Sequence, residues 1–233
     1  MKISVFDIPE IVLGKHSVKN YSLDQADKLA KAKKKTYVQV ELFGADAALD
    51  ADAIIVLKDA KADLILGDLE FVETRLSKTP PEAEKIILEK IQAALEKENF
   101  ISTIGLTDAE KVVISGYGLF TLKPVVEVTK EELGDMGTLL ARVLVESGFI
   151  SFLTVGDKEN RAWLIKKGTS AWEAAGAIHS DIQQGFIRAE IISFTDFIAG
   201  SGETGAKQAG KMRLEQKEYI MQDADLVNFR FNK

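Results

Sequence analysis

The chain has 233 residues, of which 46% are apolar, so it can bury the core of one or two domains. It has no cysteine, which excludes disulfides and thiolate chemistry, and no apolar run approaches the roughly 20 residues that a membrane-spanning helix needs. The N-terminal stretch carries Asp7 and Glu10, unlike a signal peptide, so we expect a cytoplasmic protein without membrane contact.

The net charge of −6 is unevenly distributed along the chain. Residues 148–233 carry 11 basic and 11 acidic side chains, so the whole excess of negative charge lies in residues 1–147. Generic nucleic-acid binding depends on neutralising phosphates, and an acidic chain without a basic tail argues against it. A local basic patch in the C-terminal part remains open.

Strand and helix patterns alternate in residues 1–147, which predicts βαβ units and a mostly parallel sheet. The expected strands are Lys2–Ile8, Thr36–Phe43, Ala53–Leu57 and Lys123–Val128, and the expected helices are Asp24–Lys34 and Thr138–Glu146. The Thr107–Glu110 run reads as a capping box that begins a further helix.

Two amphipathic helices are predicted at about residues 62–98, on either side of Pro80 and Pro81. Apolar side chains recur at three- and four-residue intervals in both: Ile65, Leu69, Val72 and Leu76 in the first, Ile87, Ile91, Ala94 and Leu95 in the second. This spacing predicts an αα-hairpin, and its apolar stripe is expected to be a packing seam rather than a partner groove.

Short strand patterns and one amphipathic helix make up residues 148–233. The expected strands are Phe149–Val155, Arg161–Ile165, Gly185–Phe194 and Leu226–Phe231, and the expected helix is Ser170–Ile178. Two strands, a helix, a strand and a terminal strand are the outline of a β-grasp domain. The predicted fold class is therefore α/β for residues 1–147, followed by an α+β, ubiquitin-like domain over 148–233.

The same C-terminal residues resemble the TGS domain of the YchF-type GTPases and ATPases of the Obg superfamily. The matching segments are FLTVG (152–156), RAWLIKKGT (161–169), AAGAIHSD (174–181), GFIRAEII (185–192), AGKMRLE (209–215) and YIMQDADLVNFRFN (219–232). One departure is Ala224, where the family has a glycine. Segments 62–76 and 118–128 also resemble this family, which implies a reduced P-loop-like sheet with an inserted helical arm.

The family resemblance places a P-loop at residues 3–17, where this chain departs from the motif. Gly14 and Lys15 match its end, but Pro9 replaces the first glycine and His16 the hydroxyl, with Ser17 one position late. Such changes remove backbone N–H groups and a Mg²⁺ ligand. The vestigial site would contain Gly14, Lys15, Ser17, Glu41 and Gly44, and a loop that no longer binds phosphate is expected.

The other nucleotide motifs are also altered. Glu41-Leu42-Phe43-Gly44 stands where the resemblance places DxxG, and Thr129 replaces the asparagine of the base motif. His16 and His179 lie more than 160 residues apart in a chain without cysteine, so no transition-metal site is expected. His179 and Asp181 fit a structural turn better than a general-base pair.

The preferred prediction is a non-catalytic binding protein without a cofactor. The resemblance implies contact with RNA, the ribosome or a translation-associated protein, through Arg161, Lys166, Lys167, Arg188 and Arg213. One alternative is a protein that binds or hydrolyses ATP or GTP with Mg²⁺ through an atypical P-loop. A second is a regulatory module that binds a protein or small ligand without RNA, and a homo-oligomer that completes the shortened sheet is also open.

Overall fold

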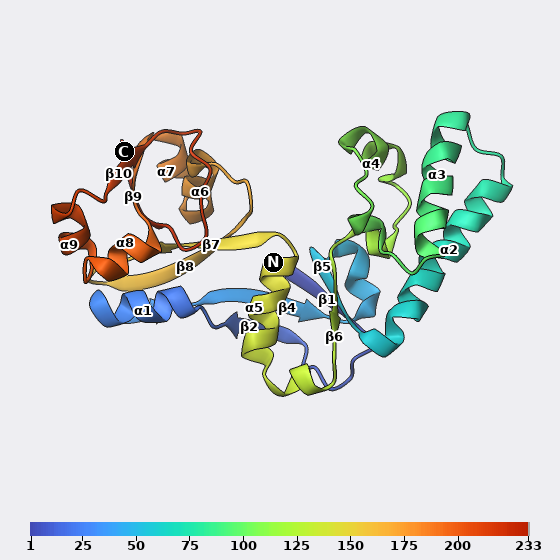
Figure 1. Ribbon diagram of the computed structural model, residues 1–233, viewed down its shortest axis with the longest axis horizontal. Helices are drawn as coiled ribbons and strands as arrows, with labels where there is room; N and C mark the ends of the chain where they lie inside the picture. The colour runs from blue at the N-terminus through green and yellow to red at the C-terminus, as the bar shows by residue number, and fades with distance from the viewer. Residues whose placement is uncertain (233) are drawn as a thin grey trace. The chain divides into compact units, whose positions relative to one another are not determined.

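The computed structural model describes residues 1–232, which form two compact units (Figure 1). The first unit consists of Met1–His16 and Val40–Leu139. The second consists of Ser17–Gln39 and the chain from Leu140 onward. The division differs from the predicted boundary at 147/148, because the segment Ser17–Gln39 packs with the C-terminal part of the chain.

The first unit contains most of a five-stranded sheet of order β2-β4-β1-β5-β6, of which the last two residues of β2 and the first two of β4 fall in the second unit. Strand β1 is parallel to β4 and β5, and β5 is parallel to β6. The strands are β1 (Lys2–Phe6), β2 (Gly14–Val18), β4 (Val38–Phe43), β5 (Ala53–Leu57) and β6 (Val125–Val128). The run Ala53–Val56 is entirely apolar and fully buried, as expected for an inner strand of a parallel sheet that is covered on both faces.

Helices of the first unit bury a separate apolar cluster. Helices α2 (Lys61–Ser77) and α3 (Glu82–Leu95) are joined by a four-residue connection that contains both prolines, and α4 (Asp108–Ile114) begins with the predicted capping box of Thr107 and Glu110. The buried residues of the cluster are Ile65, Val72, Ile87, Leu88, Ile91, Leu95, Phe100, Ile101, Leu106, Ile114 and Leu119. The remaining short helices are η1 (Ala45–Asp50), η2 (Lys58–Ala60), η3 (Ile101–Thr103), η4 (Phe120–Leu122) and η5 (Glu131–Gly134).

The second unit is built on a six-stranded mixed sheet of order β10-β9-β11-β7-β8-β3. Strands β7 and β8 are antiparallel, as are β9 with β10 and β9 with β11, whereas β7 with β11 and β3 with β8 are parallel. The strands are β3 (Lys34–Thr36), β7 (Phe149–Thr154), β8 (Glu159–Lys166), β9 (Phe186–Ile192), β10 (Arg213–Glu215) and β11 (Leu226–Phe231).

Helix α6 (Ala171–Ile178) and helix α7 (Ser180–Gln184) cover one face of this sheet, and helix α1 (Tyr21–Leu29) lies on the opposite side (Figure 1). Phe152, Ile191 and Phe229 are core residues under α6. The other helices are α5 (Met136–Glu146), α8 (Phe194–Ala199) and α9 (Glu203–Gln208).

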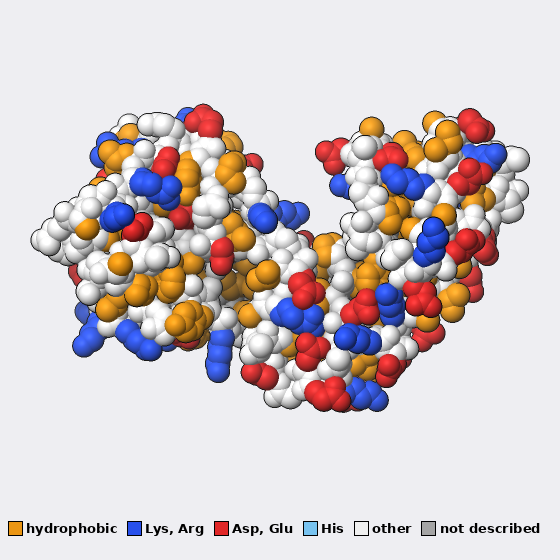
Figure 2. Space-filling view, in the orientation of Figure 1, with side chains coloured by type: hydrophobic (Ala, Val, Ile, Leu, Met, Phe, Trp, Pro, Cys, Tyr) orange, Lys and Arg blue, Asp and Glu red, His pale blue; other side chains and the backbone are white. Residues whose placement is uncertain are grey.

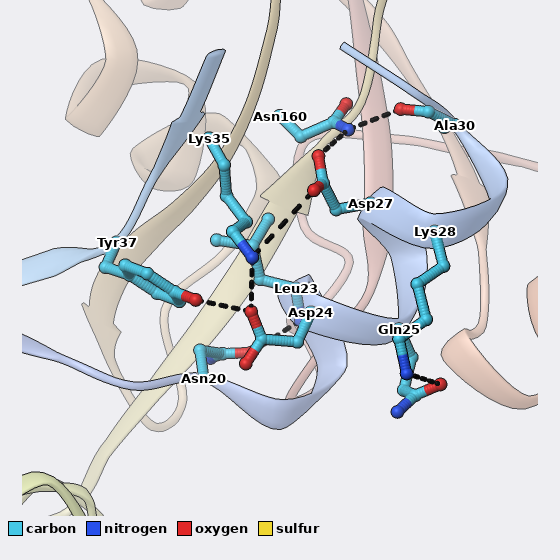
Figure 3. A network of polar contacts seen from close by, with 10 residues as sticks. All are labelled: Asn20, Leu23, Asp24, Gln25, Asp27, Lys28, Ala30, Lys35, Tyr37 and Asn160. Carbon is cyan, nitrogen blue, oxygen red and sulfur yellow. Dashed lines mark hydrogen bonds and ion pairs between the residues drawn. The ribbon is translucent and has the colours of Figure 1, made fainter.

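Polar contacts hold α1 and β3 to the sheet (Figure 3). Asn20 caps α1 by accepting from Leu23 N–H (2.8 Å). Lys35 Nζ donates to Asp24 (2.7 Å), and Tyr37 donates to the same carboxylate. Asn160, which is fully buried on β8, donates to Asp27 (2.8 Å) and to the Ala30 carbonyl. These contacts fix the segment Ser17–Gln39 in the second unit.

The prediction of a helix over Asp24–Lys34 is wrong at both ends. Helix α1 begins at Tyr21 and ends at Leu29, and Lys34, the predicted last residue, lies on β3, which pairs with β8 more than 120 residues later in the chain. The predicted strand Thr36–Phe43 is divided in the same way between β3 and β4. Within residues 1–232, no helix combines the length and the apolar composition that a bilayer crossing requires.

Candidate functional site

The loops that follow β1, β4 and β5 meet at the carboxyl edge of the parallel sheet, where α/β proteins bind their ligands. A cavity of about 530 Å³ lies there. Its walls are mainly apolar, with Asp7 and Asp63 as the charged side chains and Gly44 as backbone; the other lining residues are Val5, Phe6, Ile8, Pro9, Ile11, Leu13 and Ala45. Two carboxylates without a neighbouring cation in the wall would repel a phosphate.

Gly14, Lys15 and Ser17 do not lie in this cavity. They belong to strand β2, although we expected a loop at these positions, and Lys15 and Ser17 are exposed. A P-loop holds phosphate because its backbone N–H groups converge at the first turn of the helix that begins at its lysine. Here the next helix begins only at Tyr21, after the Asn20 cap. The strand geometry directs successive N–H groups to opposite sides and provides no such cradle.

Glu41 and Gly44 are also separated by the strand register. Glu41 lies within β4, in register with Lys2 at the start of β1, and is half-buried. Gly44 follows the end of β4 and lines the cavity, and its carbonyl accepts a hydrogen bond from Ser4 Oγ (3.2 Å). The five residues that we predicted to form a vestigial nucleotide site are therefore spread over two strands and one loop, and only Gly44 reaches the cavity.

The segment Thr129–Glu132 forms a turn with an internal hydrogen bond at the carboxyl end of β6. Thr129 N–H donates to Glu132 Oε2 (2.7 Å). Hydrogen bonds from its own backbone N–H and from Thr129 hold the pKa of Glu131 below its ordinary value. A cavity of about 260 Å³ lies beside this turn, and Lys58 and Asp59 form its opposite wall. Lys58 and Asp59 are edge residues that sequence reasoning missed, although their position directly after the predicted strand Ala53–Leu57 could have identified them.

Four of the five predicted RNA-contact residues lie on strands of the second unit, and the arginines have partners there. The Arg161 guanidinium lies 3.9 Å from the centre of the Trp163 ring. Arg188 shares the carboxylate of Glu190 with Arg230, a residue that the sequence analysis did not select.

Arg213 contacts Glu215, Asp225 and Tyr219. The lysines differ from these arginines, because Lys166 and Lys167 are exposed and form no ion pair with a described residue. On the face shown in Figure 2, basic and acidic side chains are interspersed over α2 and α3, without a continuous basic field there.

His179 is part of the local structure. Its Nδ1 accepts from Asp181 N–H (3.1 Å) and caps α7, in agreement with the structural turn that we predicted. Among residues 1–232, no three His, Asp or Glu side chains cluster closely enough to hold a metal ion. The second unit also contains a more enclosed cavity of about 290 Å³ beside β11, which the sequence did not indicate.

The chain is similar to known proteins in both sequence and fold. The family model YchF-GTPase_C, described as "Protein of unknown function (DUF933)", matches residues 149–232. The chain is 32% identical over 246 residues to the ribosome-binding ATPase YchF of Bacillus subtilis, with 78% of this chain and 67% of that protein aligned. It is 35% identical over 203 residues to the YchF of Haemophilus influenzae, with 64% of this chain and 56% of the relative aligned. Alignment with these two relatives thus covers between 56% and 67% of their length.

The alignment with the Bacillus subtilis relative contains a large gap in this chain. The aligned region is 246 positions long, whereas 78% of 233 residues is about 182. About 64 residues of the relative within that region therefore have no counterpart in this chain. Among solved structures, the YchF GTPase of Schizosaccharomyces pombe matches with a TM-score of 0.77 over 99% of this chain and 97% of that one. Their identity is 20%, so this likeness concerns the fold alone.

Proposed function

The chain belongs to the YchF-type GTPase family, and from this membership we propose that it is a non-catalytic binding protein that acts on the ribosome. The relatives from Bacillus subtilis and Haemophilus influenzae carry the name ribosome-binding ATPase. We infer that this chain shares the ribosome binding that the name states but not the ATPase activity. RNA or a translation-associated protein would be the immediate point of contact.

The observation that carries the proposal is the location of Gly14 and Lys15 on β2. Phosphoryl transfer depends on positioning the triphosphate and stabilising its developing charge. In this chain the lysine lies on a strand, the adjacent cavity contains Asp7 and Asp63, and Glu41 lies inside the sheet. The positions missing from the alignment with the Bacillus subtilis relative are consistent with a reduced nucleotide domain.

We also propose that residues 148–233 form a β-grasp domain of the TGS type, and that α2 and α3 form the inserted helical arm of the family. The strand order β10-β9-β11-β7-β8, with a parallel central pair flanked by antiparallel neighbours, supports the first assignment. The four-residue connection between α2 and α3 and the apolar cluster that they share support the second.

Co-sedimentation with ribosomes on a sucrose gradient tests the proposed function. The protein is expected in the ribosomal fractions without added nucleotide, and nuclease treatment distinguishes contact through RNA from contact through protein. Replacing both exposed lysines, Lys166→Glu and Lys167→Glu, should weaken association, since each removed phosphate contact lowers affinity and its salt dependence.

The matched control is the pair Lys78→Glu and Lys97→Glu, which changes the net charge equally at exposed positions of the first unit. Absence of the protein from ribosomal fractions at low salt would contradict the proposal. An equal loss in both double variants would assign the effect to net charge and remove Lys166 and Lys167 from the contact.

A further inference from the structure

The six-stranded sheet of the second unit has an opening between β7 and β11. Strand β11 pairs with β9 from Leu226 to Phe231, but with β7 only at Leu226, which is opposite Leu153. Strand β7 ends at Thr154. The second half of β11 therefore extends past its neighbour, so that it has a strand on one side only.

Backbone groups of β11 face this opening. Leu153 N–H donates to the Asp225 carbonyl, which identifies the side of β11 that faces β7, and Asn232 N–H donates to Gly185 on the β9 side. Because the N–H and C=O of one residue point to the same side of a strand and alternate along it, those of Phe229 and Phe231 face away from β9. No strand among the described residues pairs with them there.

The cavity of about 290 Å³ lies at this free edge. Val227 and Phe229 belong to the sheet face under α6 and α7, whereas Leu226 and Asn228 belong to the opposite face, and all four line the same cavity. Because residues from both faces of the sheet line it, the cavity must border the edge of β11. The remaining lining residues are Thr154, Val155, Ile178, Ile182, Glu190, Ile192, Phe197, Glu203, Met212 and Phe231.

Glu190 and Glu203 are the charged residues of the wall, and each pairs with basic side chains that lie outside the wall. Glu190 is only 7% exposed, and Arg230 donates to both of its oxygens (2.9 Å each). Arg188 approaches the same carboxylate at 3.5 Å, so two guanidinium groups share one anion. Glu203, the other acidic residue of the wall, is paired with Lys207 (2.5 Å). These three basic side chains and two carboxylates leave one excess positive charge beside the cavity, which a carboxylate that enters beside Asn228 would complement.

We propose that the opening binds an extended, acidic segment of a partner protein, which adds a short strand to the free edge of β11. Its backbone would pair with the N–H and C=O groups of Phe229 and Phe231. One apolar side chain of the segment would point toward Ile178 and Ile182, and the next residue, an acidic one, toward Arg230 and Arg188. This site does not depend on ribosome contact, so either assignment can fail without the other.

The first test is hydrogen exchange in the full chain, followed residue by residue by NMR. In the free protein the amides of Phe229 and Phe231 are expected to exchange faster than those of Asn228 and Arg230, which pair with β9. The probe is the peptide acetyl-Thr-Glu-Val-Glu-Thr-amide. Its addition should slow exchange at Phe229 and Phe231, and acetyl-Thr-Lys-Val-Lys-Thr-amide should have less effect.

Two variants test the site by calorimetric titration with the same peptides. Asn228→Asp introduces a carboxylate at nearly constant shape and should weaken binding of the glutamate peptide about 5-fold, the equivalent of about 1 kcal/mol. Val155→Trp should abolish binding by filling the cavity. Asn99→Asp makes the same exchange at an exposed position of the first unit and should leave binding unchanged.

Several outcomes would overturn the proposal. They are failure of the glutamate peptide to bind at millimolar concentration, equal binding of the lysine peptide, and full binding to a folded Val155→Trp variant. Protection of the Phe229 amide in the free protein would also overturn it, because the edge would then already be occupied, for example by a second copy of the chain. If Val155→Trp fails to fold, Asn228→Asp alone decides.

Discussion

Ala224 lies in the turn that leads into β11, and its backbone adopts a left-handed φ of +59° while the residue is only 5% exposed. A Cβ in this conformation costs roughly 1–2 kcal/mol, and glycine avoids that cost. Part of the gain is offset, because glycine loses more backbone entropy on folding. Ala224→Gly is therefore expected to raise the free energy of unfolding by about 0.5–1 kcal/mol, measured by urea denaturation.

The matched control is Ala209→Gly, at an exposed helix end where φ is −79°. Glycine relieves no strain there and should lower the free energy of unfolding slightly. A gain at both positions, or no gain at Ala224, would show that the left-handed turn is not strained. The sequence could indicate this position only through the family's glycine, and the structure gives the physical reason for it.

Asp24 accepts hydrogen bonds from Lys35 and Tyr37 (Figure 3), and we expect its contribution to stability to depend on pH. Burial alone would raise the pKa of its carboxyl, but hydrogen bonds from Lys35 and Tyr37 outweigh it and lower the pKa below the ordinary 3.8. A carboxyl whose pKa is lower in the folded chain stabilises the fold above its unfolded pKa, and this stabilisation disappears as pH falls through the folded value.

Asp24→Asn should accordingly lower the free energy of unfolding by about 1 kcal/mol at pH 7. The difference from the wild type should shrink as pH falls below 3.8, which urea titrations at several pH values would measure. Asp50→Asn removes the same charge at an exposed position and should have little effect at either pH. A difference that stays constant with pH would contradict the carboxylate's role.

At the scale of elements, Asp68 connects α2 to the short helix η4 through hydrogen bonds. The side chain is 2% exposed, and it accepts hydrogen bonds from Phe120 N–H (2.9 Å), Thr121 N–H (2.8 Å) and Thr121 Oγ1 (2.6 Å). Burial raises the pKa of this carboxyl although the three hydrogen bonds oppose the shift. The carboxylate thus satisfies two donors of the fully buried Thr121 and the N–H of the half-buried Phe120.

Asp68→Ala would leave the two buried donors of Thr121 without an acceptor, so a loss of about 2–4 kcal/mol in the free energy of unfolding is expected. Denaturation followed by circular dichroism would measure it. Glu70→Ala, at an exposed position of the same helix, should change stability by less than about 0.5 kcal/mol. Similar losses in the two variants would mean that the buried contacts of Asp68 do not determine the effect.

Local patterns predicted most elements of this chain, since the expected ranges Ala53–Leu57 and Leu226–Phe231 coincide with β5 and β11. Apolar alternation and capping residues are local, so a single sequence reports them. Strand β2 was missed because its Gly-Lys-His-Ser run is polar and becomes a strand only through pairing in the sheet. Strand β3 was missed for the same reason, since its partner β8 lies far along the chain.

Prediction of the site residues was limited in the same way, because it also depends on how distant strands pair. The motif comparison identified Pro9, His16 and Glu41 as altered positions, but it could not show that Glu41 lies inside a strand or that Asp63 lines the adjacent cavity. These facts depend on strand register. The opening beside β11 follows from the unequal lengths over which β11 pairs with β7 and β9, which no local pattern encodes.

At the scale of the whole molecule, membership in the YchF-type family and the position of β2 have opposite implications for nucleotide binding. Isothermal titration of the full chain with ATP and with GTP, each with Mg²⁺, decides between them. We predict no saturable heat at millimolar nucleotide. Binding at micromolar Kd that Lys15→Ala abolishes would contradict the account.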